Sequence, residues 1–301
     1  MGHDHSHGGM TNRRRLVIAI AIIGTFLAVE VAGAFLSGSL ALLADAGHML
    51  SDLLGLVIAL VALGIAARPA SDRQTFGYQR AEVFGALANG LILIAVAVYV
   101  AIEGVQRLFA PAEVVAVPML IVAGVGLLAN VVVMLVLREG AKGSIGMRGA
   151  YLEVLGDMLG SIAAVVAGVV ILTTGFAQAD AIASLLIAAL IIPRALSLLR
   201  DVFRVLSQAV PAGMDINDIR THLRDATGVV DVHDVHVWAM TSGAPVFSAH
   251  VVVTRELFER GGTGALLEEL GGCLAEHFDV EHSTFQLEPE GHAQREEHVH
   301  H

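Results

Sequence analysis

The sequence predicts a polytopic α-helical membrane protein with a small C-terminal domain of the α+β class. Of the 301 residues, 55% are hydrophobic, and the mean hydropathy of +0.71 is too high for an ordinary soluble protein. Six apolar runs approach or exceed the roughly 20 residues that a helix needs to cross a bilayer core. After residue 206 these runs give way to short segments with helical or alternating patterns.

The six apolar runs are expected to be six transmembrane helices. They cover residues 16–36, 40–67, 83–109, 114–137, 147–176 and 181–199. The breaks after the first, third and fifth runs carry almost no positive charge, whereas basic residues lie before the first run and around the other breaks, with Arg194, Arg200 and Arg204 marking the end of the sixth. By the positive-inside rule, both termini should be cytoplasmic. Because the basic residues are nearly all arginine in a chain rich in Ala, Gly and Val, we expect a bacterial inner (cytoplasmic) membrane.

The segment from about residue 207 has the pattern of a small α/β domain. Helical spacing covers residues 214–228 and 264–278, and two β-branched runs joined by a turn signal predict a hairpin. A third strand is predicted at 283–290, and an αββαβ order places helices on one face of an open sheet. The expected divisions are a tail at 1–14, a transmembrane domain at 15–206, a cytoplasmic domain at 207–290 and a tail at 291–301.

Charge and cysteine content limit the chemistry available to the chain. Residues 207–301 contain 16 acidic and 5 basic residues and so carry the whole net charge of −11, while residues 1–206 are balanced. Cys273 is the single cysteine, which excludes an internal disulfide and a cysteine-rich metal cluster within one chain. Any metal ligands would therefore be His, Asp or Glu. Lipids are expected partners, and no nucleic-acid partner is expected.

Four ionisable residues lie inside two of the apolar runs. His48 and Asp52 are four residues apart and so share one face of a helix, and Glu153 and Asp157 repeat this spacing in the fifth run. A charged side chain at the bilayer centre costs about 3 kcal/mol on insertion scales, so each should contact protein, water or a ligand. Two helices that each offer two ligands would supply the four ligands that Zn²⁺ prefers.

The alternative is that these four residues are helix-end groups paired with each other or with arginines. Against this, no Arg or Lys is expected deep in any of the six runs, and small neighbouring residues let helices approach closely. Asp45 lies nearer the start of its helix and Glu30 lies in the first run, so both are expected to be carboxylates behind the ligands. Asn89 and Asn130 are expected to form hydrogen bonds between helices.

Six motifs follow one another along the chain. In order, they are GSLALLADAGHMLSD, TFGYQRAEVFGALANG, GDMLGS, HDVHVWAM, SAHVVV and TFQLEPE. With these motifs, nearly the whole chain resembles the cation diffusion facilitator family, particularly its bacterial zinc-exporting branch. The resemblance implies a ferredoxin-like cytoplasmic domain, a homodimer, and export of a divalent metal in exchange for protons, with His48, Asp52 and Asp157 as ligands. Zn²⁺ is the expected substrate, with Co²⁺, Cd²⁺, Fe²⁺ or Mn²⁺ as alternatives, and no cofactor is expected.

The fourth ligand position departs from that branch, which usually has histidine where this chain has Glu153. Two Asp and two neutral His carry a charge of −2, which a divalent ion cancels, whereas ionised Asp52, Asp157 and Glu153 carry −3. A residual charge is costly in a low-dielectric site. We therefore expect the metal-bound site to keep one proton or to use Glu153 only occasionally. The added oxygen should favour harder ions.

Histidines of the C-terminal domain form a second candidate site. Strand alternation places His250 and Glu288 on the face of the sheet that the helices leave uncovered. The resemblance implies regulatory metal ions bound by His233, His250 and Glu288, and His282 has the same parity as Glu288. Gln286 stands where some relatives have another histidine. Ordinary surface histidines are the alternative here, and the His-rich segments at both ends could bind metal loosely or be dispensable.

Two functions other than a proton-coupled exporter fit the sequence less well. A membrane-anchored metal sensor would detect ions with its acidic domain, but an anchor gains nothing from ionisable residues inside the bilayer. An intramembrane metalloenzyme would need an open metal position and a general base, and the chain has no H-E-x-x-H motif. We therefore expect a transporter rather than an enzyme.

Overall fold

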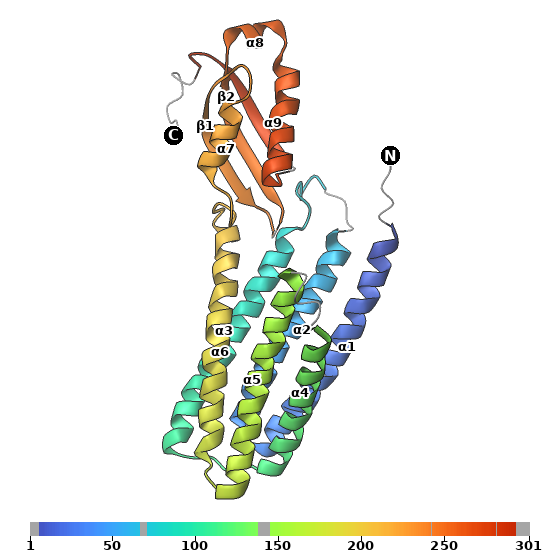
Figure 1. The fold of residues 1–301 in the computed structure, drawn as a ribbon, viewed down its shortest axis with the longest axis vertical. Helices are drawn as coiled ribbons and strands as arrows, with labels where there is room; N and C mark the ends of the chain where they lie inside the picture. Colours follow the sequence, from blue (N-terminus) through green and yellow to red (C-terminus); the bar gives the residue numbers. More distant parts are fainter. Residues whose placement is uncertain (1–5, 67–70, 138–144, 242, 281, 293–301) are drawn as a thin grey trace. The chain divides into compact units, whose positions relative to one another are not determined.

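The computed structural model describes residues 6–66, 71–137, 145–241, 243–280 and 282–292, which form two compact units (Figure 1). The first unit comprises Met1–Pro69 and Gly85–Leu199, and the second comprises Ala70–Phe84 and Arg200–His301. Each unit has its own cluster of buried apolar side chains. The two units are therefore described separately.

Six helices of the described chain are long and apolar enough to cross a membrane, as predicted. They are α1 (Ser6–Ser37), α2 (Leu40–Ala66), α3 (Arg80–Phe109), α4 (Ala116–Leu137), α5 (Ile145–Thr174) and α6 (Gln178–Leu206). Helix α1 begins ten residues before the first apolar run, and α6 continues seven residues beyond the last. Backbone hydrogen bonds do not depend on apolar side chains, so a helix can continue where its sequence turns polar.

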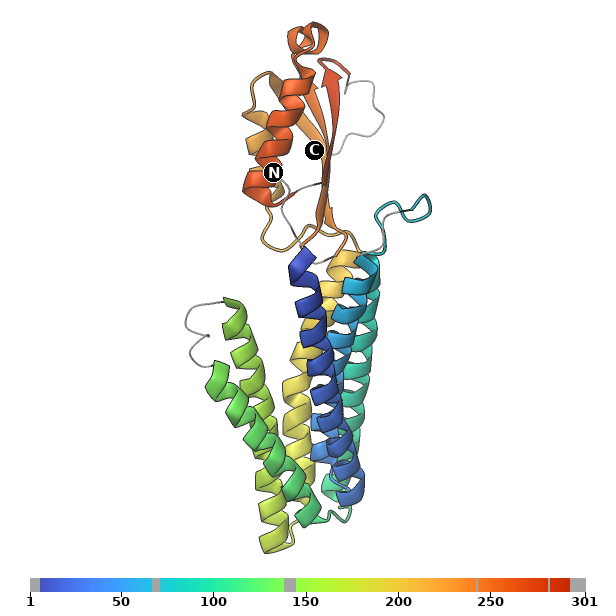
Figure 2. The same ribbon diagram turned by 90° about the vertical axis from the view of Figure 1, so that its right-hand side faces the viewer.

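Small buried residues and large exposed ones characterise the helical unit. Ala41, Ala164 and Ala195 are fully buried between helices, whereas Phe35 and Phe109 are 76% and 86% exposed. This distribution suits a bundle in lipid, where close helix packing rather than burial of large apolar groups drives association. In Figure 2, α4 and α5 run together as a pair that leans away from the other four helices where α4 ends and α5 begins. Helix α5 also contacts α2.

Helix α2 is held at its N-terminus by a residue of another helix. The fully buried Asp180, in the first turn of α6, accepts hydrogen bonds from the Ser39 hydroxyl (2.5 Å) and from the backbone N–H groups of Leu40 (2.7 Å) and Ala41 (3.2 Å). A carboxylate is favourable at this position because the first N–H groups of a helix have no partner within the helix. Asp180 of α6 thus fixes the start of α2.

Gly47 allows α2 and α3 to approach closely, one residue before His48. A Cβ atom at Gly47 would lie 2.4 Å from Cγ1 of Val96 on α3, whereas a Cβ at Gly55 on the same helix would meet nothing within 4 Å. Gly47→Ala should therefore lower the free energy of unfolding by about 1–3 kcal/mol through overpacking. Thermal unfolding of the detergent-purified protein measures this, with Gly55→Ala as the matched control. Equal melting temperatures for the two variants would contradict this packing.

The second unit is a three-stranded sheet covered on one face by helices (Figures 1 and 2). Its elements are α7 (Ile216–Arg224), β1 (Val229–Ala239), β2 (Pro245–Val253), α8 (Arg255–Arg260), α9 (Thr263–Phe278) and β3 (His282–Pro289). Strands β1 and β2 are antiparallel, and β3 runs parallel to β2. Side chains such as Ile219, Phe247 and Leu270 fill the layer between sheet and helices. The predicted αββαβ order is confirmed, with the short α8 as an unpredicted addition.

Strand β1 is interrupted by a bulge that changes which side chains face the helices. Its pairing with β2 shifts between His233 and His236, and Asp234 between them has φ 46°. Positive φ is uncommon outside glycine, and Asp adopts it more readily than most residues. The bulge therefore lets Val232 and Val235, three residues apart, both join the core.

Candidate metal sites

His48, Asp52 and Asp157 converge in the helical unit from two different helices. Each offers a ligand atom within 4.8 Å of the other two. The imidazole Nε2 of His48 lies 2.7 Å from a carboxylate oxygen of Asp157 on α5 and 3.8 Å from one of Asp52 on its own helix. His48 is 7% exposed. The structure thus brings together three of the four residues that the i, i+4 pattern singled out.

A cation also lies in this group, although no Arg or Lys was expected deep in any of the six apolar runs. The Arg194 guanidinium on α6 lies 2.9 Å from His48 Nε2 through Nη1 and donates through Nη2 to Asp52 at 3.3 Å. The side chain of Arg194 is 40% exposed, which allows it to leave the group. Arg194 lies near the end of its apolar run, and a long side chain at such a position can extend away from its own backbone to reach polar groups on a neighbouring helix.

The His48 imidazole cannot satisfy both of its close neighbours at once. If Nε2 carries a proton, it donates to Asp157, and if it is unprotonated, it accepts from Arg194. Nδ1 of the same ring is buried without a hydrogen-bond partner among the described residues. Two carboxylates and one guanidinium therefore lie around a single imidazole nitrogen. This nitrogen can either donate a proton to a carboxylate or accept a hydrogen bond from the guanidinium, but not both at once.

The remaining predicted residues of the helical unit lie around this group. Glu153 is in α5, one turn before Asp157, but its side chain lies outside the described residues. Asp45 on α2 and Glu30 on α1 are 8% and 1% exposed. A Cβ at Gly160 of α5 would lie 3.3 Å from Asp45 Oδ1, so this glycine lets α5 pack against the Asp45 carboxylate.

The two asparagines form the expected hydrogen bonds between helices. Asn89 on α3 donates to the Ser51 carbonyl of α2 at 3.2 Å, and Asn130 on α4 donates to the Ser161 hydroxyl of α5 at 3.3 Å. Ser51 precedes Asp52, and Ser161 is four residues after Asp157. These bonds therefore position the two helices that carry the candidate ligands.

A second group of potential ligands lies in the sheet unit, formed by His233, His250 and Glu288. His250 Nδ1 lies 2.8 Å from one Glu288 oxygen, and His233 Nε2 lies 3.3 Å from the other. His233 and Glu288 are almost fully buried, and the two imidazole rings have their centroids 5.1 Å apart. Two imidazoles and a carboxylate with this spacing form a donor set typical of zinc and similar ions.

The β1 bulge explains how His233 enters this group. Simple alternation would give His233 the parity of Val235 and Val237, which face the core. With Asp234 in the bulge, His233 instead pairs opposite His250 in the neighbouring strand. The Asp234 carboxylate then lies 3.5 Å from His233 Nδ1 and 3.9 Å from His250 Nδ1. Asp234 shares the strand parity of His236 on the uncovered face, but it was not predicted as a member of the site.

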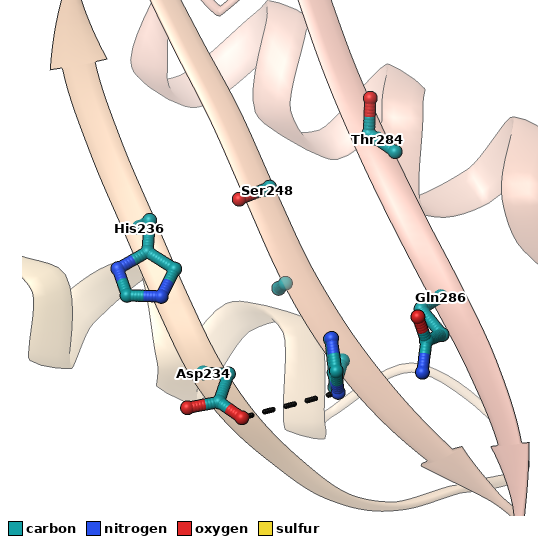
Figure 3. A pocket seen from close by; sticks show the side chains of 7 residues that line it. Asp234, His236, Ser248, Thr284 and Gln286 are labelled. Atoms are coloured by element: carbon teal, nitrogen blue, oxygen red, sulfur yellow. Dashed lines mark ion pairs between the residues drawn. The ribbon is translucent and has the colours of Figure 1, made fainter. Parts of the chain in front are cut away.

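The uncovered face of the sheet carries a polar hollow beside this group (Figure 3). It has a volume of about 330 Å³, and Asp234, His236, Ser248, Thr284 and Gln286 line it with Ala249 and His250. The dashed line in Figure 3 marks the ion pair of Asp234 with His250. Gln286 donates to Glu288 Oε1 at 2.8 Å. The group is thus accessible from the hollow and supported by a hydrogen bond to its carboxylate.

The structure does not bring His282 to this group. Its ring centroid lies 5.4 Å from that of Phe76, in an edge-on arrangement. His282 pairs with Val246 at the start of β3, whereas Glu288 pairs with Val252 near its end. Of the terminal histidines His3, His5, His7, His292, His298, His300 and His301, the described chain includes His7 and His292. The side chain of His7 lies outside the described residues, and His292 is exposed, with its backbone N–H donating to the Pro289 carbonyl at 3.1 Å.

Comparison with known protein families gives two matches that together cover most of the chain. The family model described as the cation efflux transmembrane domain matches residues 16–207. The one described as the cation efflux protein, cytoplasmic domain, matches residues 211–290. The boundary between them falls just after the end of α6.

Curated relatives match the chain over almost its full length. The metal cation efflux system protein CzcD of Cupriavidus metallidurans is 40% identical over 95% of this chain and 90% of its own. The cadmium, cobalt and zinc/H(+)-K(+) antiporter of Bacillus velezensis is 37% identical over 97% and 93%, and the zinc transporter ZitB of Escherichia coli is 38% identical over 96% and 93%. A solved structure, the metal-bound C-terminal domain of CzcD, is 33% identical and covers 25% of this chain and 99% of its own, with a TM-score of 0.23.

Proposed function

Because the chain belongs to the cation diffusion facilitator (cation efflux) family of metal transporters, and is thus a multi-pass membrane protein and not an enzyme, we propose that it exports Zn²⁺ and similar divalent ions in exchange for protons. The observation that carries this proposal is the convergence of His48, Asp52 and Asp157 from two membrane-spanning helices. The names of the relatives, a zinc transporter and a cadmium, cobalt and zinc antiporter, support the substrate class and the exchange.

The protonation of the ligands supplies the coupling between metal and protons. Metal binds to ionised carboxylates and neutral imidazole, so binding on the cytoplasmic side displaces protons. Protonation on the other side then displaces the metal. Alternating access of one site to the two sides couples the flows without a nucleophile or cofactor. We place the protein in a bacterial inner membrane with both termini in the cytoplasm, as its distribution of basic residues favours.

Arg194 offers a solution to the excess negative charge of the site. Asp52, Asp157 and Glu153 together carry −3 when ionised, and the guanidinium beside Asp52 reduces this to −2 while the site holds no metal. We propose that Arg194 offsets this charge in the metal-free site and turns toward water when a divalent ion binds. When metal leaves, the same guanidinium can bind Asp52 and His48 in its place. This lowers the free-energy cost of leaving the Asp52 carboxylate without a positive partner.

Replacing Glu153 with histidine should shift the metal preference of transport toward Zn²⁺. The change removes an oxygen donor, which suits Mn²⁺ and Fe²⁺, and adds an imidazole, which suits Zn²⁺. Competition of Mn²⁺ and Fe²⁺ with Zn²⁺ flux, measured at two pH values, tests this, and Glu103→Gln on α3 controls for loss of an intramembrane carboxylate elsewhere. If metal preference and pH profile both stay as in the unaltered protein, Glu153 is not a ligand.

We propose a regulatory role for the group formed by His233, His250 and Glu288. Its two imidazoles and buried carboxylate can hold a metal ion on the cytoplasmic side, and the acidic C-terminal segment raises the local concentration of cations. A homodimer is also proposed, in keeping with the family. In such a dimer, metal bound to the sheet unit would reduce repulsion between two acidic domains.

Everted membrane vesicles test the proposed exchange. Their cytoplasmic face points outward, so an exporter carries added Zn²⁺ into the vesicle lumen. With an acidic lumen, we expect Zn²⁺ uptake that stops when a protonophore collapses the pH gradient. A membrane-anchored sensor would show no uptake, and uptake that is independent of the gradient would contradict proton exchange.

A further inference from the structure

Two histidines on the helix-covered face of the sheet unit form a pair that neither candidate site uses. His222 lies on α7 and His277 on α9, two helices that contact each other. Their ring centroids are 5.4 Å apart, and both residues are exposed. The His233 and His250 group lies instead beside the hollow on the uncovered side of the sheet.

Backbone hydrogen bonds set the tautomer of both neutral rings, that is, which of the two ring nitrogens carries the proton. His222 Nδ1 lies 2.9 Å from the carbonyl oxygen of Asp218, and His277 Nδ1 lies 3.2 Å from that of Cys273. A carbonyl oxygen only accepts, so each Nδ1 carries the proton and donates it. Each Nε2 of the neutral ring then presents a lone pair. A ring whose other nitrogen donates to a backbone carbonyl is the usual arrangement of a metal-binding histidine.

The spacing of the two rings suits a shared ion. Two imidazoles that bind one tetrahedral metal with bonds of about 2 Å have ring centres about 5 Å apart. The observed 5.4 Å is close to this value and to the 5.1 Å between His233 and His250 in the other group. Phe278 packs edge-on against the His222 ring with centroids 5.1 Å apart, which restricts the orientation of that ring.

We propose that His222 and His277 together bind one divalent transition-metal ion through their Nε2 atoms, at a site that goes beyond the proposed transport and regulatory groups. Two imidazoles favour Cu²⁺, Ni²⁺ and Zn²⁺ over Mg²⁺ or Ca²⁺, and water completes the coordination because both rings are exposed. The bound ion would join α7 to α9, the two helices that cover the sheet. Metal at this site therefore stabilises the cytoplasmic unit against unfolding.

The single cysteine permits a site-specific test in the full-length, detergent-purified protein. Cys273 is one turn before His277, so a fluorophore attached there lies near the proposed ion. Burial, with the Glu269 and Glu276 carboxylates nearby, raises the pKa of the Cys273 thiol, so labelling is done at mildly alkaline pH. Cu²⁺ is the probe because, when bound nearby, it quenches fluorescence. We expect saturable quenching.

Variants of the two histidines decide the outcome. His222→Gln and His277→Gln should each raise the half-quenching Cu²⁺ concentration at least about tenfold, since even losing a hydrogen-bond partner of a metal ligand costs about 10–100-fold in affinity. His236→Gln, on the uncovered face, should leave it unchanged. Unaltered emission of Trp238, the single tryptophan, confirms that each variant is folded. Quenching that persists in both single variants, or falls equally in His236→Gln, would overturn the proposal.

Discussion

Asp157→Ala is expected to abolish Zn²⁺ flux, lowering the initial rate at least about 100-fold. The change removes a charged ligand from a group in which His48 Nε2 lies 2.7 Å from the Asp157 carboxylate. Removing one partner of a buried ionic group costs about 3–5 kcal/mol, which corresponds to more than 100-fold in binding. The measurement is the initial rate of Zn²⁺ uptake by everted vesicles that contain equal amounts of each protein.

A matched control separates loss of the ligand from loss of a carboxylate in general. Asp201 is exposed on α6, so Asp201→Ala should keep the rate within about twofold of the unaltered protein. Asp157→Asn keeps the size of the side chain and should be as inactive as Asp157→Ala, because the neutral amide is a weak ligand. If Asp157→Asn transports at the normal rate, the ionised carboxylate is not required.

Arg194→Gln is expected to raise the affinity for Zn²⁺ about tenfold and to slow its release. The guanidinium is a positive charge beside two of the proposed ligands, so it repels a bound cation. Two unit charges 4 Å apart interact by about 4 kcal/mol near a protein surface. Because the Arg194 side chain is 40% exposed and can turn toward water, we expect about 1.4 kcal/mol to remain, which is tenfold in affinity.

Equilibrium binding and flux should change in opposite directions in this variant. Zn²⁺ affinity of the purified protein should rise, while the maximal flux falls because release becomes slow. Arg194→Lys keeps the charge and should show a smaller change, and Arg200→Gln, six residues further along the same helix, should behave like the unaltered protein. Weaker Zn²⁺ binding by Arg194→Gln would show that the guanidinium supports the ligands instead of competing with the metal.

The sequence predicts the helical unit well because the bilayer imposes a length on each helix. The i, i+4 spacing of His48 and Asp52 also predicts which face of α2 meets α5, and the structure brings Asp157 to that face. The role of Arg194 could not be predicted in this way. Counting charges assigns it to the cytoplasmic edge together with Arg200, whereas the contact depends on the path of a long side chain.

The sheet unit shows a second limit of sequence patterns. Alternation correctly places Phe247 and Val251 in the core and His250 on the other face. It fails for β1, because one residue with positive φ at Asp234 shifts the pairing and moves His233 next to His250. Nothing in the local sequence requires Asp234 to adopt this conformation. The resemblance to a family, rather than the strand pattern, pointed to His233.

Simultaneous recording of Zn²⁺ and protons in proteoliposomes tests the proposed exchange most directly. The purified protein is reconstituted with a zinc-sensitive and a pH-sensitive dye inside the vesicles, and Zn²⁺ is added outside. We expect Zn²⁺ entry and proton exit to start together in the unaltered protein, and Asp52→Ala to lose both flows. Zn²⁺ entry that continues in Asp52→Ala, or that proceeds in the unaltered protein without proton exit, would contradict transport through this site.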